Sequence, residues 1–197
     1  RIFQFKITLR GTKPPVWRRI QVPGEYSFWD LHVAIQDAMG WLDCHLHQFD
    51  ILDYGSRQIE HIGFPDDEFL LEQVVLPGWE VPIARLFTNA KQKAGYLYDF
   101  GDGWEHDVQL RGAVSLDESF RRRLVAGQRA FPPEDCGSYP GYERCVRVPE
   151  VKNLVSISWM AWISGRSRWR SCGGRWAFCF RSRCITRRRR PRISRWA

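Results

Sequence analysis

YLYDFGDGWEHDVQL, residues 96–110, carries the strongest local folding signal in the chain. Apolar and polar side chains alternate in its two arms, and a Gly-Asp-Gly sequence separates them. Alternation with a period of two indicates half-buried strands, and a glycine-rich centre favours a tight turn, so the segment predicts a β-hairpin. It also holds the densest group of ionisable side chains in the chain, which are Asp99, Asp102, Glu105, His106 and Asp107.

Strand-like alternation recurs on both sides of this hairpin. Residues 2–10 and 16–22 flank a Gly- and Pro-containing turn, and residues 45–53 and 57–62 form a second pair. Residues 116–127 favour a short helix or loop, and residues 130–143 are a loop rich in Pro and Gly. Strands joined as hairpins predict a single α+β domain with a mainly antiparallel sheet.

One amphipathic helix is expected after the first pair of strands. Ser27 and Asp30 have the spacing of a capping box, and Gly40 stands where a helix would end. Between them an apolar stripe at helical spacing runs from Leu31 to Met39. This is the main helix that the sequence predicts.

Charge divides the chain into two parts. The 197 residues carry a net charge of +8, yet residues 1–150 hold 17 Lys and Arg against 22 Asp and Glu, which gives −5. The last 47 residues hold 13 basic side chains and no acidic one. We therefore predict a folded domain over residues 1–147 and a basic, Arg- and Trp-rich tail over 148–197. An acid-free composition of this kind favours a frameshifted or disordered tail, while a genuine nucleic-acid-binding tail is the alternative.

Histidines and carboxylates supply the candidate chemistry. Imidazole and carboxylate ligands suit divalent metals, and the same groups act as general acids and bases. The metal-ligand candidates are His45, His47, Asp102, His106 and Glu134, and the catalytic candidates are Asp99, Asp102, His106, Glu134 and Asp135. Cys136 is a further candidate nucleophile, if a histidine served as its base. Structural roles for all these side chains remain the competing interpretation.

Arginines near the first turn are the candidates for nucleic-acid contact. Arg18 and Arg19 follow Trp17 on a predicted strand and could meet phosphate, together with Arg10 and Arg111. Sequence patterns typical of P-loops, dinucleotide folds, zinc proteases and serine hydrolases are not present in the chain.

Five segments in order, PPVWRRIQVP, LHVAIQDAMGW, HLHQFDI, YLYDFGDGWEHDVQL and AGQRAFPPEDCGSYPGYE, resemble the plasmid pRiA4b ORF-3-like family over about residues 1–147. The resemblance implies a compact α+β domain carried on plasmids and insertion sequences, and some members bear the label insertion-element passenger protein of TnpR type. It implies no reaction. Positions that match the family pattern are Trp17, Arg18, Arg19, His32, Gln36, Trp41, His45, His47, Tyr98, Asp99, Gly101, Asp102, Trp104, His106, Pro133, Glu134, Asp135 and Gly137. Ser138 stands where the family usually has glycine, so a positive φ there would be strained.

The sequence thus predicts a non-enzymatic accessory or binding domain of a mobile genetic element, with an unknown protein or nucleic-acid partner. A metal-dependent hydrolase or nuclease that uses the histidine and carboxylate side chains is one alternative, and a DNA-binding accessory factor is another. No organic cofactor is expected, and a divalent metal ion is left open as an alternative. We expect a cytoplasmic protein without a membrane partner, because no secretion signal or apolar spanning segment is evident.

Overall fold

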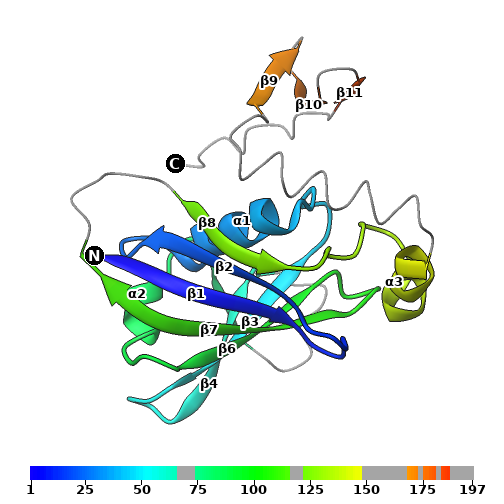
Figure 1. Cartoon of the computed structure of the whole chain (residues 1–197). Coiled ribbons are helices and arrows are strands. Elements are labelled where there is room, and N and C mark those ends of the chain that lie inside the picture. Colours follow the sequence, from blue (N-terminus) through cyan, green and yellow to red (C-terminus); the bar gives the residue numbers. More distant parts are fainter. Residues whose placement is uncertain (66–73, 116–121, 148–167, 173–174, 181–182, 187–197) are drawn as a thin grey trace. The chain divides into compact units, whose positions relative to one another are not determined.

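The structure is a computed structural model that describes residues 1–65, 74–115, 122–147, 168–172, 175–180 and 183–186 (Figure 1). Backbone contacts divide the chain into two units, Arg1–Asn153 and Leu154–Ala197. The first unit contains every candidate residue named above.

An eight-stranded sheet forms the body of the first unit. Its strands are β1 (Ile2–Leu9), β2 (Val16–Pro23), β3 (His47–Asp53), β4 (Gln58–Gly63), β5 (Val75–Pro77), β6 (Lys93–Tyr98), β7 (Trp104–Val114) and β8 (Arg123–Gln128). Their spatial order is β5-β4-β3-β6-β7-β1-β2-β8, and β4 with β5 is the parallel pair of this otherwise antiparallel sheet. The predicted α+β class with a mainly antiparallel sheet is confirmed.

The three predicted hairpins are confirmed by the strand register. Tyr98 pairs with Trp104 across the β6–β7 turn, β1 pairs with β2, and β3 pairs with β4. The alternation in β1 turns Phe3, Phe5, Ile7 and Leu9 into the core, as expected for a strand buried on one face.

Helix α1 (Phe28–Met39) begins at the predicted capping box and ends at the predicted glycine. The Asp30 amide donates to the Ser27 side chain at 3.1 Å, and the Asp30 carboxylate accepts from the Ser27 amide at 3.0 Å. Gly40 ends the helix with a left-handed φ of 79°. The apolar stripe of α1 packs into the core, and the helix lies across one face of the sheet (Figure 1). A short helix, α2 (Ile83–Leu86), adds two buried side chains to the same core.

Two local predictions are wrong. Residues 123–128 form strand β8 at the sheet edge, because pairing with β2 outweighs the helical preference of their Arg, Leu and Ala side chains. Residues 116–121 of the same predicted segment lie outside the described residues. Part of the predicted Pro- and Gly-rich loop forms helix α3 (Ser138–Arg147), in which Pro140 occupies the first turn, where a missing amide hydrogen costs nothing.

The second unit has a three-stranded antiparallel sheet with order β11-β10-β9. Its strands are β9 (Arg168–Cys172), β10 (Arg175–Phe180) and β11 (Arg183–Thr186). The remainder of the predicted tail lies outside the described residues, so the frameshift hypothesis stays a prediction.

Within the described ranges, no helix combines the length and the apolar character needed to cross a membrane.

Candidate functional site

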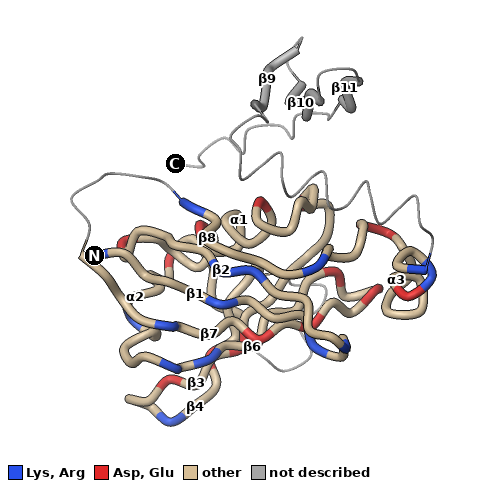
Figure 2. The backbone as a smooth tube through the Cα atoms, in the orientation of Figure 1, with Lys and Arg blue, Asp and Glu red and all other residues tan. Residues whose placement is uncertain are grey.

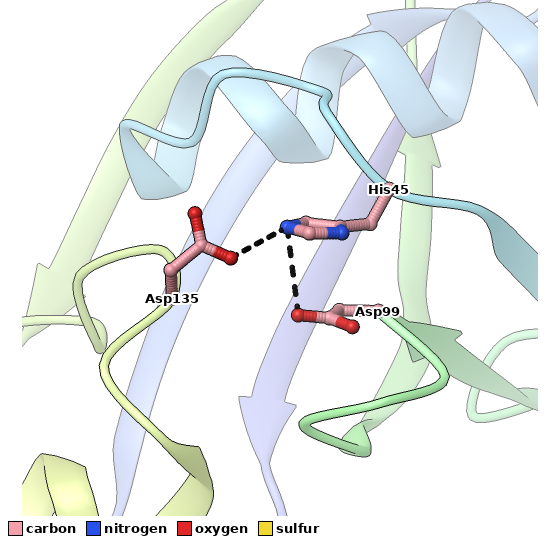
Figure 3. Close-up of side chains that lie close together, drawn as sticks. All are labelled: His45, Asp99 and Asp135. Carbon is pink, nitrogen blue, oxygen red and sulfur yellow. Dashed lines mark hydrogen bonds and ion pairs between the residues drawn. The ribbon is translucent and has the colours of Figure 1, made fainter.

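Three side chains from separate segments meet beside the β6–β7 turn (Figure 3). His45 comes from the connection between α1 and β3, Asp99 from the turn after β6, and Asp135 from the loop before α3. His45 Nε2 lies 3.0 Å from Asp135 Oδ1 and 3.6 Å from Asp99 Oδ2. One ligand atom from each of the three residues lies within 4.8 Å of the other two. We call this group the His45 cluster.

The turn itself orients Asp99. The residue has a left-handed φ of 57°, and its Oδ1 accepts from the Gly101 and Asp102 amides at 3.0 and 3.2 Å. Its own amide donates to the carbonyl of Leu46, the neighbour of His45. Because Oδ1 is held by the turn, Oδ2 faces the imidazole of His45.

The loop that carries Asp135 is fastened to the sheet by its neighbours. Trp41 Nε1 donates to the carbonyl of Pro132 at 2.8 Å. Glu134 accepts from the Tyr98 hydroxyl at 2.5 Å with one oxygen and from the Leu42 amide at 2.8 Å with the other. Burial, followed by the Glu134 carboxylate, raises the pKa of Tyr98 well above its usual value, so the phenol stays a proton donor.

The donors of the His45 cluster suit a divalent metal ion. One imidazole and two carboxylates are ligands that Zn²⁺ and Mn²⁺ accept, at about 2.0 to 2.2 Å from the metal in the case of zinc. The side chain of Asp99 is 11% exposed, that of His45 29% and that of Asp135 75%. An ion held here would therefore have a sheltered side at Asp99 and an open side at Asp135.

Two of the predicted metal ligands lie in the core instead. The His47 ring stacks on His32 with centroids 3.5 Å apart, and burial, followed by the charge of His32, lowers the pKa of His47 to about 2. The buried His106 contacts the Tyr96 carbonyl through Nδ1 at 3.1 Å, and burial lowers its pKa to about 3. Among the described residues, neither belongs to a group that could hold a metal.

Asp102 and Glu134, two further candidates, make hydrogen bonds to the surrounding loops and do not join the His45 cluster. The Asp102 carboxylate accepts from the Gly137 amide at 3.3 Å, and its carbonyl accepts from Ser138 Oγ at 2.7 Å. Asp102 therefore fastens the start of α3 to the hairpin, and Glu134 joins Tyr98 to Leu42. Of the candidates, His45, Asp99 and Asp135 are the ones that the fold brings together.

A buried polar network connects helix α1 to Tyr96 of β6, and none of the sequence patterns assigned it a role. His32 contacts Asp43 through Nε2 at 2.8 Å and Tyr96 through Nδ1 at 2.9 Å, and Gln36 donates to the same Tyr96 hydroxyl at 3.0 Å. A signal for it was present, since His32 and Gln36 stand four residues apart on the apolar stripe of a helix.

The burial of Arg18 argues against its predicted contact with nucleic acid. Its side chain is 3% exposed, and its guanidinium donates to the carbonyls of Trp17, Ala38 and Arg129 at 2.9, 3.2 and 2.7 Å. Burial lowers its pKa to about 10. A guanidinium enclosed in this way cannot reach a phosphate on the surface.

The other arginine candidates are engaged on the sheet surface. Arg10 pairs with Glu105 and Asp107 at 3.1 and 2.8 Å, Arg19 lies 5.7 Å from the Trp17 ring, and Arg111 donates to Gln109.

Cys136 is a poor nucleophile in this fold. Its side chain is half-buried, and burial raises the pKa of the thiol to about 11. Because the thiolate is the reactive form, this raised pKa lowers the share of reactive sulfur near neutral pH.

Comparisons with known proteins identify a family, one relative and one solved structure of similar sequence. The model of the plasmid pRiA4b ORF-3-like protein family matches residues 1–167, beyond the predicted limit at residue 147. The uncharacterized protein y4hQ of Sinorhizobium fredii (strain NBRC 101917 / NGR234) is 34% identical over 142 residues, which cover 72% of this chain and 70% of that protein. The crystal structure of the protein of unknown function MM3350 from Methanosarcina mazei Go1 has a TM-score of 0.65 and 32% identity, covering 79% of this chain and 88% of the other. The chain therefore belongs to the plasmid pRiA4b ORF-3-like family.

Proposed function

We propose that this chain is a non-enzymatic binding protein of a plasmid or insertion sequence. In this proposal the His45 cluster holds a divalent cation, and the partner binds at that cation. The observation that carries the proposal is the convergence of one imidazole and two carboxylates within 4.8 Å. The three residues come from segments far apart in the sequence, so their meeting is a product of the fold. The plasmid origin in the family description supports the biological setting.

A cation at this position would tie three loops together. It would offset the repulsion between Asp99 and Asp135, both of which face the same imidazole nitrogen. It would also fix the loop before α3 against the β6–β7 turn. The exposed side at Asp135 would leave coordination positions for a donor group of a partner.

Calorimetric titration of the full chain with Zn²⁺, Mn²⁺ and Mg²⁺ tests the site. We expect one saturable site that prefers Zn²⁺ or Mn²⁺ to Mg²⁺, because imidazole is a poor ligand for Mg²⁺. The variants His45→Gln and Asp99→Asn should each weaken binding at least about tenfold, since each removes one of three ligands. Affinity should also fall on acidification, because protons compete with the metal for these groups.

A matched histidine and carboxylate pair provides the control. His61 and Asp50 lie 2.7 Å apart on β4 and β3, but they belong to no group of three ligands among the described residues. His61→Gln should leave metal affinity unchanged. Equal losses in His61→Gln and His45→Gln, or no saturable binding by the wild type, would refute the proposal.

Metal-dependent hydrolysis is the second candidate, favoured by the open side of the cluster. A bound ion there would have room for a water molecule and an acidic substrate. The metal-loaded samples of the titration decide between the two functions when they are incubated with bis(p-nitrophenyl) phosphate. Turnover that disappears in Asp99→Asn would establish the hydrolase, and binding without turnover supports the non-enzymatic site.

A further inference from the structure

A second concave site lies where the β1–β2 turn, the residues after β8 and helix α3 meet. The cavity has a volume of about 420 Å³. Sites for small molecules occupy about 300 to 1,000 Å³, so this cavity is of suitable size. It shares no residue with the His45 cluster, and the inference drawn from it is independent of the proposed function.

The apolar walls of the cavity are held in place by the core. Val16 and Tyr142 are buried, and the Tyr142 hydroxyl donates to the carbonyl of Ala130 at 2.7 Å. The Tyr139 ring packs on Trp104 with centroids 5.1 Å apart. On its other side, Tyr139 Cε1 lies 3.2 Å from the position that a Cβ on Gly11 would occupy. Two aromatic walls are therefore preformed.

Basic side chains surround these walls. Lys13, Arg129 and Arg147 line the cavity together with one acidic residue, Glu143. Arg147 and Glu143 form an exposed pair at 3.5 Å, and pairs of this kind are weak. Within the described part of the chain, no ion pair joins Lys13 or Arg129 to a carboxylate. Basic positions at the β1–β2 turn and at the end of α3 are visible in Figure 2.

The positive charge here is a local feature of an acidic domain. Residues 1–150 carry a net charge of −5, so a site with three basic side chains and one acidic one departs from its surroundings. Arg129 lies near the Tyr142 hydroxyl, and its charge lowers the pKa of that phenol against the larger opposite effect of burial. A cationic group and an aromatic wall therefore stand together.

We propose that this cavity binds a small anion that carries a flat aromatic ring, such as an aryl phosphate or a mononucleotide. The phosphate accepts charge-assisted hydrogen bonds from Lys13 and Arg129. The ring packs against Tyr139 and Tyr142, in the offset or edge-on arrangements that aromatic groups prefer. The occupant matches the cavity in charge, shape and size.

Titration calorimetry of the full chain with phenyl phosphate tests the site. We expect one molecule bound per chain, and Lys13→Gln and Arg129→Gln should each weaken binding about tenfold, because each removes a charged hydrogen bond. Lys93→Gln and Arg111→Gln are matched controls, since they remove exposed basic residues outside the cavity and should change affinity less than about twofold.

Equal weakening in the control variants would show general attraction to a basic chain and would overturn the proposal, as would the lack of a saturable site. Titrations with inorganic phosphate and with phenol separate the two parts of the ligand. Phenyl phosphate should bind more tightly than either. If inorganic phosphate bound equally well, the aromatic part of the proposal would be wrong. Circular dichroism of each variant shows whether the fold is retained, which we expect because Lys13 and Arg129 are exposed.

Discussion

The buried imidazoles of His47 and His106 are side chains whose ionisation in the acid range differs between the folded and the unfolded chain. An unfolded histidine gains its proton near pH 6.5, whereas burial lowers the pKa to about 2 for His47 and about 3 for His106. Below pH 6.5 the unfolded chain therefore binds protons that the folded chain does not. Stability is fully present above that pH and is lost as the pH falls toward 3.

Urea unfolding between pH 7.5 and pH 4 should show this loss. Each of the two imidazoles should contribute a slope of up to about 1.4 kcal/mol per pH unit once the pH is well below 6.5. The variants His47→Asn and His106→Asn should each remove one histidine's contribution to the slope of the unfolding free energy against pH. If both variants kept the wild-type slope, other groups would be responsible for the acid sensitivity.

Ser138 shows that the departure from the family pattern has a structural cost. Its φ is 59°, in the left-handed region where glycine is unstrained, as the resemblance predicted. The serine hydroxyl compensates in part, because it donates to the Asp102 carbonyl at 2.7 Å. The strain was predictable from the sequence, but the compensating bond was not, since it joins residues 36 positions apart.

At the scale of elements, the sequence predicts the helices and strands that are stabilised by residues near them in the chain. The capping box of α1 and the β6–β7 hairpin lie within short segments whose residues specify their own turns and ends. Strand β8 and helix α3 depend on partners elsewhere: β8 pairs with β2, and the start of α3 is held by Asp102. Such elements are set by tertiary contacts, which periodicity does not show.

Gly141→Ala should detach the start of α3. A Cβ at this position would lie 1.7 Å from the carbonyl oxygen of Cys136, a distance that requires the backbone to move. We expect a loss of more than about 2 kcal/mol in the free energy of unfolding, measured in urea.

Gly55→Ala is the matched control for that substitution. Its nearest contact would be the Asp53 carboxylate at 3.4 Å, which is ordinary packing, so the change should be within about 0.5 kcal/mol. Similar losses in the two variants would mean that the contact with Cys136 is not the cause.

At the scale of the molecule, the sequence indicated which residue types could form a site, but not which of those residues lie together in space. His45, Asp99 and Asp135 were all candidates, yet they stood beside His47, Asp102, His106 and Glu134, which have equally suitable side chains. His47 and His106 are excluded because they face the core, and Asp102 and Glu134 because they bind the start of α3 and the Tyr98–Leu42 pair. The position of three loops around one point follows from the sheet order, which no single segment encodes.

The division of charge predicts where any affinity for DNA resides. Residues 1–150 carry −5 and the last 47 residues carry +13, while Arg10 and Arg18 of the first unit are already engaged. The full chain should bind duplex DNA with an affinity that falls steeply with salt, because binding releases counterions. A chain shortened after residue 153 should show no binding at 0.15 M salt in a fluorescence anisotropy titration. Unchanged affinity in the shortened chain would place the DNA site on the first unit.

The central position of strand β1 has a consequence for synthesis. Its residues 2–9 pair with residues 106–114 of β7, so β1 waits for a partner that is made about a hundred residues later. At roughly 5 to 20 residues per second, the wait on the ribosome is about 5 to 20 s. During that time β1 lacks the strand that pairs along its second edge, and the loop with Asp135 emerges later still. The nascent chain therefore passes through an interval in which one edge of β1 is unpaired and open to aggregation, and the His45 cluster cannot form before the loop with Asp135 has been made.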